Sequence, residues 1–168
     1  MLSFICTVFD GTFYKWDKER PADLSDAIMC FHSDDENVDL LHSMGCYSLD
    51  VVKLINACYS KHYCDTVLFV LCKDEVEFDC IVNYVTGVTG KCIDTFIKVE
   101  SYEDVLKYIQ CLLDVKKASK GDCLFLIDDT DLYDAAELYG LKVITSSTNP
   151  DEYFAPCVVY AIDSIDLL

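Results

Sequence analysis

The chain has 168 residues, of which 52% are hydrophobic and 12% aromatic, and its formal net charge is −17. This length suits one domain with its own core, and the apolar content excludes a disordered chain. The charge argues against a nucleic-acid partner, because phosphate backbones are bound chiefly through Lys and Arg. We therefore expect a single globular domain over residues 1–168 that binds no nucleic acid.

Membrane and disulfide classes are also disfavoured. The longest apolar stretches have the length of a strand and fall short of the roughly 18 residues of a membrane span. The first of them, residues 2–9, has neither a basic region before it nor a cleavage site after it. The eleven cysteines are odd in number and lack the close spacing of zinc knuckles. We predict reduced core thiols in a cytoplasmic protein.

Apolar runs of strand length alternate along the chain with segments of helical period, a pattern that predicts βαβ units around a mostly parallel sheet. The expected strands cover residues 2–9, 66–72, 92–98, 123–127 and 142–145, with a possible last edge strand at 157–162. The expected helices cover residues 48–62 and 74–85, a segment that starts after Ser101, and the segment from Asp131 to Gly140. We predict a three-layer Rossmann-like α/β fold of about five strands with helices on both faces.

The segment that follows the first strand has a different composition. It contains Pro21 and the acidic cluster Asp34-Asp35-Glu36, and a short apolar patch at residues 27–31 predicts a small helix. We interpret residues 13–45 as a small, acidic, cap-like insertion.

Acidic residues follow two of the predicted strands. Asp10-Gly11-Thr12 comes after the first strand, and Asp128-Asp129 begins an acidic loop after residues 123–127. Ligands of parallel sheets bind outside the carboxyl ends of the strands. Two carboxylate clusters brought together there repel each other unless a cation compensates, and Mg²⁺ with a phosphate group suits such a site.

Three segments resemble motifs of the haloacid-dehalogenase-like (HAD) superfamily, whose members are mostly magnesium-dependent phosphatases with an aspartate nucleophile. Residues 9–13 resemble the first motif, 66–78 the second, and 124–144 the fourth. The resemblance implies that Asp10 is the nucleophile and a metal ligand. It also implies that Asp128 or Asp129 is the second acidic ligand and that Asp134 could assist.

The sequence departs from the family pattern at the catalytic positions. Thr12 stands where the family has its general acid, and a hydroxyl is a poor proton donor compared with a carboxylic acid. Cys72 stands where the second motif has serine or threonine. The phosphate-facing lysine has two candidates, Lys98 and Lys107.

Simpler structural interpretations remain open for the acidic residues: Asp10-Gly11 also suits a turn, and residues 128–131 also suit a helix cap. We therefore keep three functional hypotheses. The first is a magnesium-dependent phosphohydrolase or phosphotransferase that forms an aspartyl-phosphate on a small phosphorylated substrate. The second is a catalytically silent HAD-like protein that binds a protein partner through its acidic surface. The third is a PIN/NYN-like metal nuclease, which the net charge disfavours.

Overall fold

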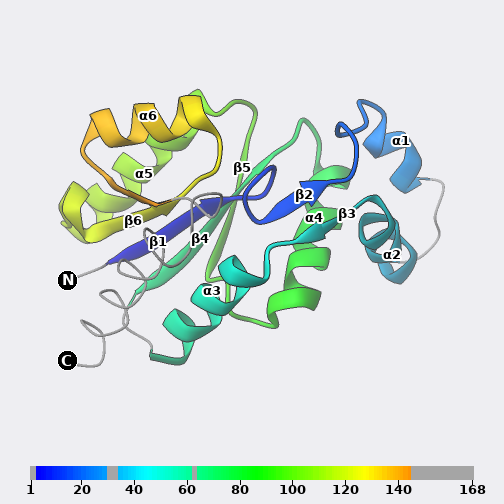
Figure 1. The fold of residues 1–168 in the computed structure, drawn as a ribbon, viewed down its shortest axis with the longest axis horizontal. Coiled ribbons are helices and arrows are strands. Elements are labelled where there is room, and N and C mark those ends of the chain that lie inside the picture. The colour runs from blue at the N-terminus through cyan, green and yellow to red at the C-terminus, as the bar shows by residue number, and fades with distance from the viewer. Residues whose placement is uncertain (1–2, 30–33, 62–63, 145–168) are drawn as a thin grey trace.

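The computed structural model describes residues 3–29, 34–61 and 64–144. A central sheet of five parallel strands forms the middle of the molecule (Figure 1). The strands are β1 (Phe4–Val8), β4 (Asp65–Leu71), β5 (Thr95–Val99), β6 (Cys123–Leu126) and β7 (Lys142–Ile144). Their order across the sheet is β5-β4-β1-β6-β7, and each neighbouring pair is parallel. The predicted α/β class, the parallel sheet and its five strands are confirmed.

Helices cover both faces of this sheet. Helices α3 (Leu49–Lys61) and α4 (Glu75–Thr89) lie on one face, and α5 (Glu103–Lys116) and α6 (Thr130–Tyr139) lie on the other (Figure 1). The alternation of side chains along each strand explains the two layers. On β1, the side chain of Ile5 packs in the core beneath α3 and α4. Cys6 and Val8 pack in the core on the other face, together with Val105 and Ile109 of α5. A single 3₁₀ turn, Lys120–Asp122, precedes β6.

An insertion follows β1 and lies beyond the carboxyl end of that strand (Figure 1). It contains two short strands, β2 (Tyr14–Trp16) and β3 (Gly45–Tyr47), which pair antiparallel. Between them stand the helices α1 (Leu24–Met29) and α2 (Asp34–Met44). The sequence predicted one small helix here, whereas the structure has two helices and a strand pair. Both strands have only three residues, too few for an alternating pattern to stand out.

Aromatic packing fixes the insertion to the main fold. Tyr14 is fully buried, and its ring stacks on Phe9 with the ring centroids 4.9 Å apart. It also makes an edge contact of 5.4 Å with Tyr84 of α4, and its hydroxyl donates to the Leu41 carbonyl of α2. Aromatic pairs of this kind contribute about 0.5–1.5 kcal/mol each beyond the area they bury. The insertion is therefore anchored to β1 and α4 through the core that it shares with one face of the main sheet.

Two element boundaries differ from the prediction by three residues or more. Strand β5 begins at Thr95 rather than at residue 92, because the buried Ile93 belongs to a loop in which Asp94 accepts a hydrogen bond from the Thr66 amide. Helix α4 continues to Thr89, four residues beyond its predicted end at residue 85. The expected edge strand at residues 157–162 lies outside the described part of the chain.

The structure also bears on the membrane prediction. Among the described residues, no helix combines the length and the apolar character that a membrane crossing requires.

Candidate active site

Asp10 and Asp128 follow the neighbouring strands β1 and β6, at the same edge of the sheet. The hydroxyl of Thr12, which is fully buried, links the two segments by accepting a hydrogen bond of 3.0 Å from the backbone N–H of Asp128. The two strands that precede these aspartates are therefore adjacent in the sheet.

Both carboxylate oxygens of Asp10 have donors from the insertion. The indole Nε1 of Trp16 donates to Oδ1 at 2.7 Å, and Nη1 of Arg20 donates to Oδ2 at 2.6 Å. The Asp10 side chain is only 15% exposed. Burial raises the pKa of Asp10 above its ordinary value, and the opposing effects of Arg20 and Trp16 do not offset it. Trp16 and Arg20 thus hold the Asp10 side chain from two sides.

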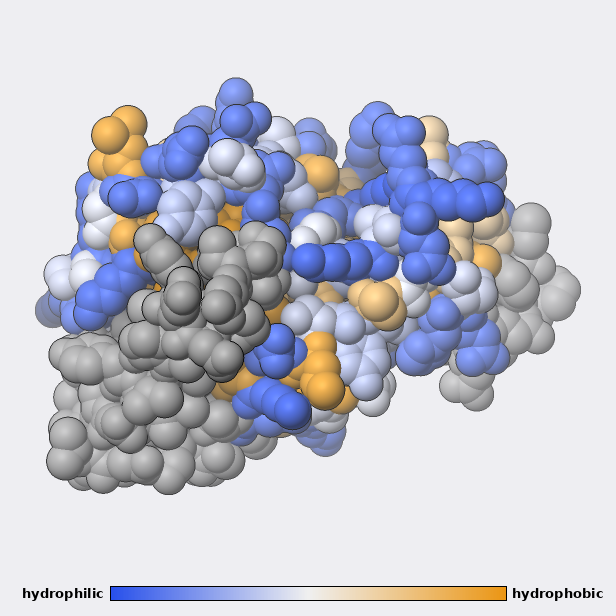
Figure 2. All heavy atoms as spheres, viewed as in Figure 1, coloured by the Kyte–Doolittle hydropathy of each residue, from blue (hydrophilic) through white to orange (hydrophobic). Residues whose placement is uncertain are grey.

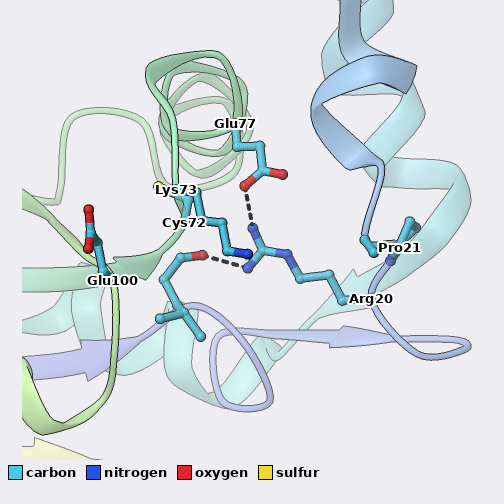
Figure 3. Close-up of a pocket in the computed structure, with 8 residues that line it drawn as sticks. Arg20, Pro21, Cys72, Lys73, Glu77 and Glu100 are labelled. Carbon is cyan, nitrogen blue, oxygen red and sulfur yellow. Dashed lines mark hydrogen bonds and ion pairs between the residues drawn. The ribbon is translucent and has the colours of Figure 1, made fainter.

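Arg20 connects three separate parts of the chain. Besides Asp10, its guanidinium donates to the Leu71 carbonyl at the end of β4, at 2.6 Å, and to Oε2 of Glu77 in α4, at 3.2 Å (Figure 3). The sequence analysis missed this residue. One signal could have found it: the only arginine and the only tryptophan of the chain both lie within ten residues after Asp10.

Asp128 also has a cationic partner. Its Oδ2 lies 3.3 Å from Nζ of Lys15, on β2, and its side chain is only 7% exposed. The insertion therefore supplies a cation to each of the two strand-end aspartates, Lys15 from β2 and Arg20 from the segment after it.

The other predicted acidic ligands have different surroundings. Asp129 is the N-cap of α6, where its Oδ1 accepts a hydrogen bond of 2.9 Å from the Leu132 amide. This is the capping alternative that the sequence left open. Asp134 is exposed in the middle of α6. Asp129 also lines a pocket of about 480 Å³ together with Tyr102 and Leu106.

Cys72 follows β4 and is buried, and burial is the main reason why the pKa of its thiol rises to about 11. A thiol with this pKa stays protonated at neutral pH and is a weak nucleophile. Cys72 lines a pocket of about 280 Å³ beside the guanidinium of Arg20, with Lys73, Glu77 and Glu100 also in its wall (Figure 3).

The two lysine candidates lie elsewhere. Lys98 is on β5, the edge strand of the sheet, and forms an ion pair of 2.7 Å with Glu75 that raises the pKa of the lysine. Lys107 is exposed on α5. Neither of them lines the pocket beside Arg20, whereas Lys73 does.

The carboxylates that would hold a magnesium ion at this edge of the sheet are paired with cations of the chain. No three His, Cys, Asp or Glu side chains within residues 3–29, 34–61 and 64–144 are grouped so that they could hold a metal. The carboxylates of Asp10 and Asp128 instead form ion pairs with Arg20 and Lys15. The positive charge at this edge of the sheet comes from the protein.

Comparison with solved structures shows which fold this is. A haloacid-dehalogenase-like hydrolase from Bacteroides fragilis superposes with a TM-score of 0.53 over 92% of this chain and 93% of its own, at 13% identity. A HAD-family enzyme from Bacteroides thetaiotaomicron, solved with magnesium and inorganic phosphate, has a TM-score of 0.51 over 86% of this chain and 94% of its own, at 8% identity. No protein-family model and no curated protein matches the sequence. The chain has a divergent HAD-like fold.

Proposed function

We propose that this HAD-like chain does not transfer phosphoryl groups and acts instead as an acidic protein-binding module. One observation carries the proposal: both aspartates at the carboxyl ends of β1 and β6 are ion-paired with cations of the chain's own insertion, Asp10 with Arg20 and Asp128 with Lys15. A working nucleophile needs an oxygen that can approach phosphorus. Here each oxygen of Asp10 accepts a hydrogen bond shorter than 2.8 Å.

The leaving group also lacks a proton donor. Thr12, at the position of the family's general acid, is fully buried, and its oxygen already accepts a hydrogen bond from the Asp128 amide. A hydroxyl is far too weak an acid to protonate an alkoxide in the way a carboxylic acid does. Nucleophile and acid are therefore both compromised in the same site.

The surface supports a binding role. The chain carries 30 acidic residues against 13 basic ones, and hydrophilic side chains cover much of the described surface in Figure 2. A surface of one charge sign attracts oppositely charged partners and speeds their association. The partner we propose is a basic segment of another protein, with an affinity that falls as salt is added.

A turnover assay tests the loss of catalysis. The substrates are an aryl phosphate, whose leaving group needs little protonation, and an alkyl phosphate, each with Mg²⁺ present. We expect the wild type to hydrolyse both at the rate of the Asp10→Asn variant, because the Asp10 carboxylate is held by Arg20. Turnover of the aryl ester by the wild type that Asp10→Asn abolishes would refute the proposal.

A binding assay tests the second half. Fluorescence anisotropy with a labelled lysine-rich peptide should show saturable binding at low salt that weakens as salt rises, and a glutamate-rich peptide of equal length should not bind. Absence of binding by the lysine-rich peptide at low salt would contradict a module that recognises basic segments.

A phosphohydrolase is the second candidate. It is favoured by the neighbouring positions of Asp10 and Asp128, and by the fold shared with a family enzyme solved with magnesium and phosphate. This hypothesis requires that Arg20 first release Asp10. The Thr12→Asp variant distinguishes it: if the machinery is intact, the restored acid should raise turnover of the alkyl ester more than that of the aryl ester.

A further inference from the structure

We infer that the guanidinium of Arg20 takes the place of a divalent cation at this edge of the sheet, so that the chain itself supplies the counter-charge and the resting site requires no metal ion. The inference goes beyond the proposed function, because it concerns which cation the site holds rather than whether the site turns over substrate.

The groups around Arg20 are those that a hard cation selects. Two carboxylates, from Asp10 and Glu77, and one backbone carbonyl, from Leu71, all direct oxygens at the guanidinium. Magnesium and calcium bind carboxylate and carbonyl oxygens, and magnesium completes its shell with waters. These oxygens come from the end of β1, the end of β4 and the first turn of α4. The site thus has an oxygen-lined cation position with an arginine in it.

The arginine is held firmly in that position. Its side chain is 20% exposed, and its guanidinium lies 5.7 Å from the centre of the Trp16 ring. Arginine stays protonated at any ordinary pH, so its charge cannot be lost by titration. A divalent ion would have to displace a charge that already satisfies three acceptors. Asp128, the other strand-end carboxylate, is paired with Lys15 and is therefore not available as a ligand for a divalent ion.

Removal of Arg20 should therefore create a metal site. In Arg20→Gln, the partly buried carboxylates of Asp10 and Glu77 lose their shared counter-ion and repel each other. A cation between them then relieves the repulsion. Since the two carboxylates and the carbonyl already face the position of the guanidinium, the variant should bind divalent ions on the order of tenfold or more tightly than the wild type.

Trp16 provides the readout, because it is the only tryptophan and it touches Asp10. Terbium(III) excited through tryptophan luminesces only when bound close to the indole. We expect Arg20→Gln to give a terbium signal that Mg²⁺ competes away and that disappears in the double variant with Asp10→Asn. The double variant also measures the background from other acidic residues near Trp16. Lys18→Gln is the matched control: it removes the same charge two residues away and should behave as the wild type.

Two outcomes would overturn the inference: a wild-type terbium signal equal to that of Arg20→Gln, or a wild-type melting temperature that Mg²⁺ raises in an Asp10-dependent way. If Arg20→Gln is unfolded in chelator, recovery of its circular dichroism on addition of Mg²⁺ supports the inference, and failure to recover counts against it. None of these measurements uses turnover, so the inference and the proposed function can fail separately.

Discussion

The indole N–H of Trp16 donates a 2.7 Å hydrogen bond to Oδ1 of Asp10, which places the only tryptophan of the chain on the central carboxylate of the candidate site. Ionisation of Asp10 therefore changes the charge directly beside the fluorophore.

Asp10 should titrate above its ordinary pKa of 3.8, because burial raises its pKa by more than Arg20 and Trp16 lower it. We expect a change in Trp16 emission with a midpoint above 3.8 that is absent from Asp10→Asn. Because the folded state binds this proton more tightly than the unfolded state, the Asp10 contribution to the free energy of unfolding should decrease as pH rises through the folded-state pKa. A midpoint at or below 3.8 would show that the ion pair outweighs burial.

Gly45 should not tolerate a side chain. A Cβ at this position would overlap the Lys15 carbonyl and approach the Tyr14 ring to 2.8 Å, within the β2–β3 pair. We expect Gly45→Ala to lower the free energy of unfolding by about 1–3 kcal/mol, as in other overpacked sites. Thermal or urea unfolding measures it.

Gly87 provides the matched control, since a Cβ there meets no atom within 4 Å and the residue lies inside α4. Gly87→Ala should stabilise the protein by about 0.5–1 kcal/mol, through helix propensity. Equal effects of the two substitutions would contradict the close approach at Gly45.

Asp129 should contribute to stability as a helix cap. Asp129→Ala removes the acceptor of the Leu132 amide, which should cost about 1 kcal/mol and lower the melting temperature by roughly 2–4 °C. Asp134→Ala, on the exposed side of the same helix, should leave stability unchanged or slightly higher, because alanine favours helix. If Asp129 were instead a metal ligand, its substitution would change the response to Mg²⁺ and leave stability in chelator unaffected.

The cysteines should differ sharply in reactivity. None of the eight cysteines whose side chains the structure describes forms a disulfide bond, and Cys6 and Cys123 are buried with their sulfurs 3.7 Å apart. The pKa of Cys6 lies well above its ordinary value. The hydrogen bond with Cys123 is the largest cause, and burial is the second. In the native protein, a maleimide should therefore label the exposed Cys46 and Cys111 and spare Cys6 and Cys123. Peptide mapping by mass spectrometry reads this out, and two or more native disulfides in the same spectra would contradict the predicted reducing compartment.

The sheet could be predicted from sequence because each of its strands is a short apolar run. Phe69 on β4 and Phe125 on β6 belong to such runs and are fully buried. Continuous apolar runs of this kind are typical of a parallel sheet that is covered on both faces, so local composition is enough to predict it. The neighbouring positions of Asp10 and Asp128 then followed from the family resemblance.

The partners of the site residues could not be predicted in this way. Arg20 acquires its role from contacts with Leu71 and Glu77, which are 51 and 57 residues away in sequence. Neither hydrophobic periodicity nor a turn motif predicts contacts between residues so far apart in sequence. Glu77 in particular sits in the first turn of a predicted helix, where an acidic residue is usual for reasons of the helix dipole alone.

The pairing of β2 with β3 also has a consequence for how the chain could change. The amide of Asp17 donates to the Met44 carbonyl at 2.9 Å, so the two ends of the segment between these residues lie side by side. Changes of length in the loops of this segment should carry a modest entropic cost, because closing a loop depends only weakly on its length. Arg20 lies within this segment, whereas Lys15 and Trp16 lie on β2, outside it. Substitution of the loop that carries Arg20 would thus alter the charge of the strand-end site, while Leu24, Ile28 and Leu41 of the same segment stayed in the core.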